Sequence, residues 1–455
     1  MLATSAARAA ADGATWPRPA ARTAPERTPR SRRSRRPWPR ADRPPAHGGR
    51  GKKNFVARGT VSVFAAWLAA NPRRLRALCP ARPVSRSGPH WIRDRASMSC
   101  EPMKLFRCQS CDNVLYFENR SCERCGHRLA YLPQLGRISA LEPAGDNTWT
   151  PLAAPDRPGF FCTNAAHDAC NWMVPPGTTD AFCLACRHNG TVPDVNDPVN
   201  LERWREMEHA KHRLFYTLLR WNLPLKTRAE DPEHGLIFNF LADSPDSSGP
   251  KVMTGHENGI ITIALVEADP AEREKRRTSM GEPYRTLLGH FRHEVGHHYW
   301  DILVRDAGKL APCRAVFGDD SQDYGASLQR HYNQGPPPNW QETFVSAYAT
   351  THPWEDFAET WAHYLHIVDT LEMASAFGMQ VKPKADVEGE LATRVDFDPY
   401  AAETVEQIID AWLPFVFAMN SVSRTMGEGD LYPFVLGPAV VTKLGFIHNL
   451  VHGRV

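Results

Sequence analysis

The five-residue run His293-Glu294-Val295-Gly296-His297 contains the residue types that a metal-dependent hydrolase needs. In a helix, histidines at positions i and i+4 lie on one face, where both imidazole rings can bind one zinc ion. Glu294 lies beside them and can take a proton from a water molecule on that ion. Two flanking histidines, His290 and His298, do not lie on the helix face that carries His293 and His297. We expect them to pack around the site or to support its ligands.

A zinc ion that catalyses hydrolysis needs a third protein ligand and an open coordination position. The best candidates are Glu355 and Glu359, which are spaced i,i+4 in a later segment. One carboxylate can bind zinc while the other holds the free ring nitrogen of a ligand histidine. Apolar neighbours indicate that this segment is a buried helix, in which carboxylates need partners. His352 and His363 are alternative ligands.

Eight of the eleven cysteines lie between residues 108 and 186, in pairs or near-pairs. A Cys-x-x-Cys turn places two thiolates on one side of a tight knuckle, and two knuckles complete a tetrahedral zinc shell. The spacing therefore predicts two structural zinc sites. In the second site, whose first pair is spread out, His167 could replace one cysteine. The expected ligands are Cys108, Cys111, Cys122 and Cys125 in the first site, and Cys162, Cys170, Cys183 and Cys186 in the second.

A disulfide framework is the alternative use of these cysteines, and it would require an oxidising compartment. We find no convincing signal-peptide pattern, and Cys-x-x-Cys pairs favour metal over disulfides. We therefore expect a cytoplasmic protein. No stretch approaches the roughly 18 consecutive apolar residues of a membrane-spanning helix, so we expect no membrane association.

The charge of the chain is divided unevenly along its length. Residues 1–102 hold 22 Lys/Arg and 5 Asp/Glu (net +17), whereas residues 103–455 hold 32 and 46 (net −14). The Arg-, Ala- and Pro-rich composition of 1–102 predicts a disordered basic tail, or a mis-assigned start. We expect a zinc-ribbon module over 103–190 and a catalytic domain over 200–455. The acidic body argues against nucleic acid as a partner and favours cationic or unfolded proteins.

The pattern of residues 200–455 predicts an α+β domain with a small antiparallel sheet. Apolar periodicity predicts helices over 200–221, with Asn200 as the cap, and over 283–305, 341–349, 354–376 and 400–420. Strands are expected over 235–241 and 259–264. Segment 306–340 is expected to be a loop-rich insertion. This arrangement places the His-Glu-x-x-His run inside the helix that follows the strands.

Together these segments resemble the bacterial family of zinc-binding metallopeptidases that carry an N-terminal zinc-ribbon module. The resemblance runs from about Met103 to about Met379 and implies a zincin-like catalytic domain. The residues that carry it are the two cysteine quartets, Cys170-Asn-Trp, Thr254-Gly-His, Gly289-His-Phe-Arg-His-Glu-Val-Gly-His and His352-Pro-Trp-Glu-Asp-Phe-Ala-Glu-Thr-Trp-Ala-His-Tyr-Leu-His.

The site also resembles the gluzincin type found in anthrax lethal factor. There, a glutamate of a Glu-x-x-Ala-Glu segment binds zinc, and a tyrosine seven residues earlier assists catalysis. The resemblance implies that Glu355 is the third zinc ligand, that Glu359 supports a ligand histidine and that Tyr348 is catalytic. One departure from a compact thermolysin-like layout is the 57 residues between His297 and Glu355.

Two functions follow from these patterns. The first is a zinc metallopeptidase that hydrolyses peptide or protein substrates with Glu294 as the general base. The alternative is a non-catalytic adaptor, in which the zinc ribbon recruits a partner and the zincin-like domain serves as a scaffold.

The motifs predict three zinc ions per chain, one catalytic and two structural. Elemental analysis of protein purified without added metal should approach three zinc ions, and His297→Ala should remove one of them. A value near two that His297→Ala leaves unchanged would show that the third site binds no metal.

Overall fold

The computed structural model describes residues 105–178, 180–243, 252–280 and 286–455. All of these belong to one of the two compact units of the chain, 71–455. The expected tail, 1–102, lies outside the described residues. Among the described helices, none is long and apolar enough to cross a membrane.

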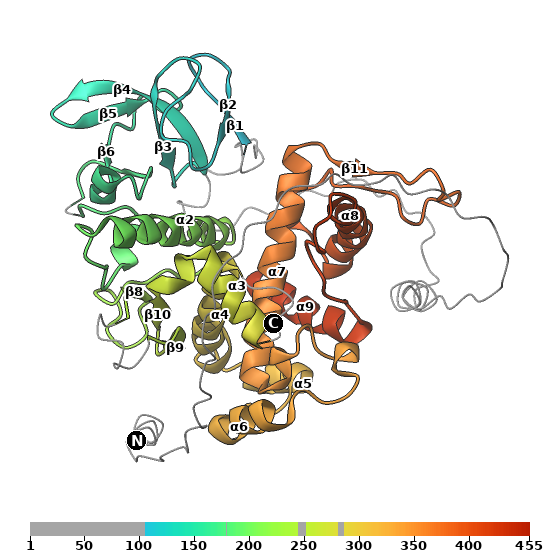
Figure 1. Ribbon diagram of the computed structural model, residues 1–455. Helices are drawn as coiled ribbons and strands as arrows, with labels where there is room; N and C mark the ends of the chain where they lie inside the picture. The colour runs from blue at the N-terminus through green and yellow to red at the C-terminus, as the bar shows by residue number, and fades with distance from the viewer. Residues whose placement is uncertain (1–104, 179, 244–251, 281–285) are drawn as a thin grey trace, which may run out of the picture. The chain divides into compact units, whose positions relative to one another are not determined.

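The cysteine-rich region is built from short antiparallel strands (Figure 1). A small apolar core of Ala130, Leu132, Leu141 and Met173 stabilises it. Such a core is small, which is typical of domains that need metal for stability. The strands are β1 (Leu105–Arg107), β2 (Val114–Tyr116), β3 (Arg128–Leu132), β4 (Arg137–Gly145), β5 (Thr148–Pro151), β6 (Phe160–Phe161) and β7 (Met173–Val174).

Helix α2 (Pro198–Arg220) follows this region and begins two residues earlier than expected. Its cap is Asp197, not Asn200, because the Asp197 carboxylate accepts hydrogen bonds from the backbone N–H groups of Val199 and Asn200. Proline in the first turn has no N–H to lose, so Pro198 is compatible with this start.

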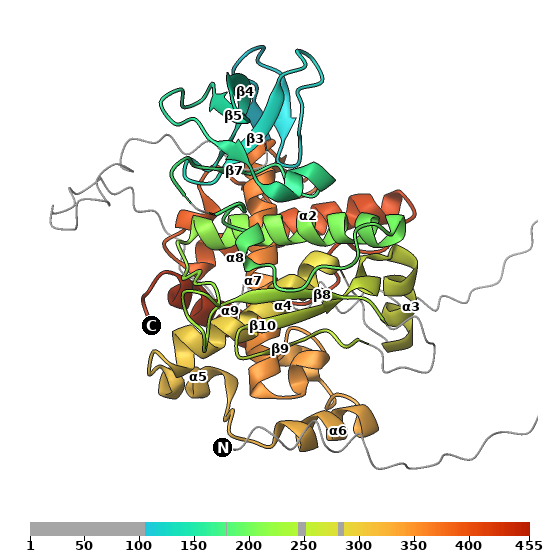
Figure 2. The same cartoon turned by 90° about the vertical axis from the view of Figure 1, so that its left-hand side faces the viewer.

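The expected antiparallel sheet is wrong in one respect. The structure contains a mixed sheet in the order β8 (Ile237–Leu241), β10 (Ile260–Ala264), β9 (Gly255–Glu257). Strand β9 was not expected, because a strand of three residues is too short to show an alternating pattern of apolar and polar residues. It forms a hairpin with β10 through Asn258 and Gly259, both of which have positive φ. Because the chain reverses in β9, β8 and β10 run parallel, and both are visible with β9 in Figure 2.

The His-Glu-x-x-His run lies in α4 (Leu287–Trp300), which continues into a π-helical turn over Asp301–Arg305. The insertion that follows is largely helical rather than loop-rich. It contains α5 (Leu310–Phe317) and α6 (Tyr324–Gln334), and Asp323 caps α6 by accepting from the N–H of Ala326. Segment 341–349 has only short 3₁₀ turns at Trp340–Glu342 and Tyr348–Thr350, so the helix expected there is wrong.

Helix α7 (Pro353–Ala376) confirms the expected helix over 354–376 and packs along α4 (Figure 1). Gly296 permits this close approach, since a Cβ atom there would lie 3.1 Å from the Cα of Ala358. The remaining elements are α3 (Pro270–Met280), β11 (Gln380–Val381), β12 (Thr393–Arg394), α8 (Val405–Thr425) and α9 (Pro438–Val451).

Asp369 joins three parts of the fold within the buried interior. Its carboxylate accepts hydrogen bonds from Thr217 of α2, at 2.9 Å, and from Tyr400, and it pairs with Arg292 of α4. Arg292 and Asp369 are both buried, so each charge depends on the other for compensation. Arg292 immediately precedes His293, and the network therefore fixes the helix that carries the motif.

Asp369→Ala should destabilise the protein by about 3–5 kcal/mol, because it leaves a buried arginine without its carboxylate. Urea denaturation of the full chain measures this free energy of unfolding. Arg424→Ala is the matched control, since its ion pair with Asp430 lies at the surface and pairs of that kind contribute about 0–1 kcal/mol. Equal effects of the two substitutions would contradict the role given to Asp369.

Candidate functional site

Helices α4 and α7 bring the predicted site residues together. His293 and His297 lie one turn apart on α4, and Glu355 lies in the first turn of α7. Thr286 caps the N-terminus of α4 by accepting from the N–H of Gly289 at 3.0 Å. Acidic residues are favoured in the first turn of a helix, because the backbone N–H groups there are unsatisfied and partly positive.

Three side-chain atoms converge at the contact between these helices. The Nε2 atoms of His293 and His297 lie 3.2 Å apart, and Glu355 Oε2 lies 3.0 Å and 3.4 Å from them. Zinc bonds of about 2.0–2.2 Å in a tetrahedral shell would separate such donor atoms by about 3.3–3.5 Å. The three donors therefore fit one face of a tetrahedral zinc shell, which leaves a fourth position for another group.

Burial supports this interpretation of the three donors. Glu355 is only 2% exposed, and its Oε2 atom has no hydrogen bond of good geometry among the described residues. A buried carboxylate oxygen is costly unless a cation meets it, and the neighbours of this oxygen are the two imidazole rings of the same cluster. The donor set of two imidazoles and a carboxylate is one that zinc accepts.

Glu359 lies on the opposite side of the His293 ring. It accepts a hydrogen bond from His293 Nδ1 at 2.7 Å, and Ser346 donates to its other oxygen. Despite its burial, these hydrogen bonds and the charge of His293 lower the pKa of Glu359 to about 2. Glu359 is therefore an ionised acceptor that fixes the ring so that Nε2 faces Glu355 and His297.

Glu294 and two tyrosines interact electrostatically with the donor cluster. Glu294 is buried, and this burial raises the pKa of its carboxyl group. Burial, together with the charges of Glu355 and Glu294, raises the pKa of both Tyr348 and Tyr324, so each phenol keeps its proton at neutral pH. The ring of Tyr348 lies 5.9 Å from that of His293, measured between centroids.

Tyr324 is a site residue that the sequence pattern did not indicate. It begins α6, in the insertion, and its hydroxyl donates to Glu355 Oε1 at 2.7 Å. Tyr324 also lies close enough to Tyr348 to raise the pKa of that second phenol. No periodic signal could have found Tyr324, because it is 31 residues from Glu355 and reaches it only through the fold of the insertion.

The other histidines near the motif have different partners. His352 caps α7 by accepting from the N–H of Trp354, and His363 contacts the hydroxyl of Tyr432. His290 lies 3.5 Å from the carboxylate of Glu267. None of these three is among the residues that converge at the described site.

Two aromatic rings enclose His297. The ring centroids of His297 and Trp354 are 3.7 Å apart, and His256 lies parallel to His297 at 6.0 Å. Burial lowers the pKa of His256 to about 2, so this ring is neutral. Neutral rings hold His297 in place without adding charge to the donor cluster.

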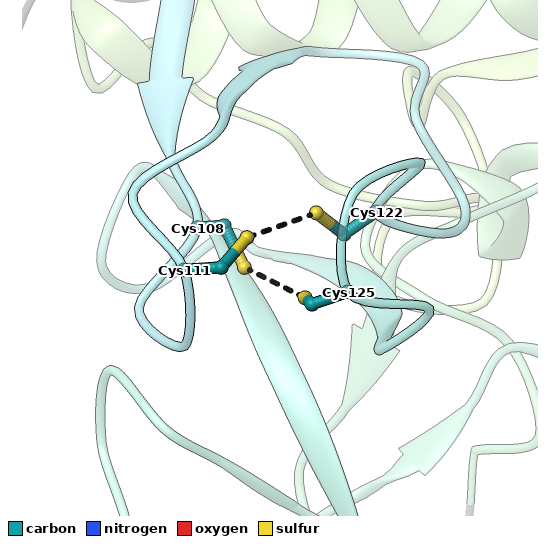
Figure 3. Close-up of side chains that lie close together, drawn as sticks. All are labelled: Cys108, Cys111, Cys122 and Cys125. Carbon is teal, nitrogen blue, oxygen red and sulfur yellow. Dashed lines mark hydrogen bonds between the residues drawn. The ribbon is translucent and has the colours of Figure 1, made fainter.

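The eight paired cysteines form two separate clusters. In the first, the sulfurs of Cys108 and Cys125 lie 3.6 Å apart and those of Cys111 and Cys122 lie 3.5 Å apart (Figure 3). In the second, the sulfurs of Cys170 and Cys183 lie 3.7 Å apart. Zinc–sulfur bonds of about 2.3 Å predict about 3.8 Å between thiolates in a tetrahedral shell. The described cysteines are free thiols, so a disulfide framework finds no support among them.

Another histidine, His212 of α2, contacts the second cluster. Its Nε2 atom lies 3.3 Å from the sulfur of Cys170 and 3.6 Å from that of Cys186. His167, which the sequence suggested as a replacement for a cysteine, contacts Trp204 through its ring and Arg205 through its carbonyl. The apolar periodicity of α2 gave no indication that one of its histidines reaches the cysteines.

A family model described as "Putative zinc-binding metallo-peptidase" matches residues 200–450, more than half of the 455 residues. The chain belongs to this family. A zinc-ribbon domain model matches residues 105–197, so the resemblance drawn from the motifs is confirmed. Zinc binding is supported both by these matches and by the cysteine clusters.

Two mycobacterial proteins match most of the length of the chain. Uncharacterised proteins of Mycobacterium tuberculosis (strain H37Rv) and Mycobacterium bovis are each 40% identical to this metallopeptidase-family chain over 350 residues. The matched segment covers 77% of this chain and 95% of each relative. No solved structure matches the chain significantly.

Tyr324→Phe should weaken metal binding at the His293, His297 and Glu355 cluster by about 10–100-fold, because it removes the hydrogen bond that orients Glu355. Zinc affinity measured by competition with a chelator tests this. Tyr332→Phe, which changes an exposed tyrosine on the same helix, is the control. Wild-type affinity in Tyr324→Phe would show that Glu355 is oriented without it.

Proposed function

We propose that this protein is a zinc-dependent metallopeptidase of the gluzincin type, with a zincin-like catalytic domain in which α4 is the active-site helix. The observation that carries the proposal is the convergence of His293 Nε2, His297 Nε2 and Glu355 Oε2 at distances that suit one zinc ion. These three residues are the proposed ligands of the catalytic ion.

When bound, the ion supplies a Lewis acid that activates a water molecule and polarises a scissile carbonyl group. Glu294 accepts the proton of that water and later passes it to the leaving amine. Its burial raises its pKa, which brings its basicity closer to the operating pH than that of an exposed glutamate. Tyr348, still protonated at neutral pH, donates a hydrogen bond to the oxyanion that develops on the carbonyl oxygen.

The cysteine quartets are the proposed structural zinc sites. Four thiolates close a zinc shell and leave no position for a substrate, which distinguishes these centres from the catalytic one. The proposal therefore places three zinc ions in each chain. The proposed substrates are peptides or proteins, as the family description suggests. A cytoplasmic location remains our prediction from the cysteine pattern.

Glu355→Ala and Glu359→Ala should differ in severity. Glu355→Ala removes a ligand and should lose the catalytic zinc, whereas Glu359→Ala should weaken zinc binding by about 10–100-fold, the usual effect of losing a ring-orienting partner. Zinc titration of both variants measures this. The reverse order of severity would assign the ligand role to Glu359.

The variant Glu294→Gln distinguishes a metallopeptidase from a non-catalytic adaptor. It should retain the fold and all zinc but lower the rate of peptide cleavage by about 10²–10⁴-fold, since it removes the general base. Tyr348→Phe should also slow turnover while sparing zinc. The measurement is cleavage of a peptide library with zinc content determined on the same samples. If wild type and Glu294→Gln are equally inactive, the adaptor alternative replaces this proposal.

A further inference from the structure

Helix α2 places a histidine against the second cysteine cluster. The Nε2 atom of His212 lies 3.3 Å, 3.6 Å and 4.0 Å from the sulfurs of Cys170, Cys186 and Cys183. Zinc bonds of about 2.3 Å to sulfur and about 2.0–2.1 Å to an imidazole nitrogen separate the two donor atoms by about 3.5–3.6 Å in a tetrahedral shell. The three distances lie on either side of this value, so they suit one nitrogen and three sulfurs around a single ion.

The other side of the ring determines which nitrogen can bind a metal. His212 Nδ1 lies 2.6 Å from the backbone carbonyl oxygen of Glu208, and this oxygen can only accept, so Nδ1 donates. A neutral imidazole that donates from Nδ1 carries its lone pair on Nε2. The atom that faces the sulfurs is therefore the atom with the free lone pair. Histidine ligands of metal ions commonly donate their other ring N–H to a backbone carbonyl in this way.

The second cluster thus offers five donor atoms for a shell of four. Cys162 brings the number to five, because its sulfur lies within 4.8 Å of the other three sulfurs. Structural zinc takes four ligands, so one donor stays outside. Outside a shell of four thiolates, the buried Nε2 lone pair of His212 would face negatively charged sulfurs with no proton between them. Inside the shell, the same lone pair meets the cation, which removes the cost of burying it without a partner.

The charges around the cluster favour the shell that contains the imidazole. A zinc ion with four thiolates carries one more negative charge than an ion with three thiolates and a neutral imidazole. The buried carboxylate of Glu208 lies 3.4 Å from the sulfur of Cys186. The buried ammonium group of Lys211 pairs with that carboxylate at 2.9 Å and balances its charge. A further negative charge in this buried region would cost several kcal/mol, and ligation by His212 avoids it.

We propose that His212 is a ligand of the second zinc ion and that Cys162 stays beside the shell as a thiol. The other ligands are Cys170, Cys183 and Cys186. This inference rests on the proposed zinc site at the second cluster, and it changes one ligand of that site.

The second ion then joins two regions of the chain. The three cysteines belong to the zinc-ribbon region, 105–197, whereas His212 belongs to the metallopeptidase region, 200–450. His212 lies on α2, which packs on α4, the helix that carries the His-Glu-x-x-His run. The second centre therefore attaches the zinc ribbon to the helices of the catalytic domain, whereas the first centre takes its ligands from the ribbon alone.

Substitution of ¹¹³Cd for zinc in the full chain reports the ligands, because the NMR signal of the ion moves with the number of thiolates bound. We expect one resonance typical of four thiolates, from the first cluster, and one typical of three thiolates and one nitrogen. Cys170→Ala should remove the second resonance and so assigns it. With ¹⁵N-labelled histidine, this resonance should show a spin coupling to one imidazole nitrogen.

Zinc affinity at the second centre, measured by competition with a chelator, gives a second test. His212→Ala should weaken binding by more than about 100-fold, beyond the effect of losing a residue that only orients a ligand. Cys162→Ser removes the competing donor and should stay within a few-fold of wild type. His209→Ala, on the same helix, is the control and should also stay within a few-fold.

Two resonances typical of four thiolates, neither coupled to a histidine, would overturn the proposal and return Cys162 to the shell. Loss of zinc in Cys162→Ser with wild-type affinity in His212→Ala would do the same. If both substitutions lose zinc or fail to fold, the wild-type spectrum decides between the two shells. A single resonance from the cysteine-rich region, unchanged by Cys170→Ala, would instead contradict the zinc site on which this inference rests.

Discussion

The contact between α4 and α7 buries charged side chains from both helices, and each of these charges depends on a partner across the contact. His293 of α4 meets Glu355 and Glu359 of α7, and Arg292 of α4 meets Asp369 of α7. A charge buried without a partner would cost several kcal/mol. Because the partners come from different helices, the charges specify one relative placement of α4 and α7, and the donor cluster follows from that placement.

This constraint extends outward from the cluster. Glu359 orients His293, and Ser346 in turn holds Glu359. Asp369 holds Arg292, next to His293 in sequence, and is itself held by Thr217 of α2 and by Tyr400. The apolar core alone would allow α4 to slide or rotate slightly, whereas these directional hydrogen bonds fix its rotation about its axis. A set of residues that binds one metal ion needs this precision, because a ligand displaced by a fraction of an ångström no longer fits the coordination shell.

Much of the candidate site could be predicted from the sequence, because its signals are local. Spacings of four residues along helices place His293 with His297 and Glu355 with Glu359, and Cys-x-x-Cys knuckles mark the cysteine centres. The residues that were missed act across long sequence separations. Tyr324 and His212 reach their partners only after the chain has folded, and neither lies in a sequence pattern that predicts a contact. The parallel pairing of β8 with β10 was missed because β9 is too short to produce an alternating pattern.

The insertion between the two halves of the donor cluster places a second tyrosine next to the first. Tyr324 donates to Glu355, and burial, Glu355 and Tyr324 together raise the pKa of Tyr348. The proton of Tyr324 is committed to Glu355, because an ionised carboxylate oxygen can only accept. In the proposed mechanism Tyr324 orients Glu355, which leaves the hydroxyl of Tyr348 to donate to the oxyanion that develops on the substrate. The insertion therefore contributes a partner for Glu355, and under that proposal one tyrosine orients a carboxylate while the other stabilises developing charge.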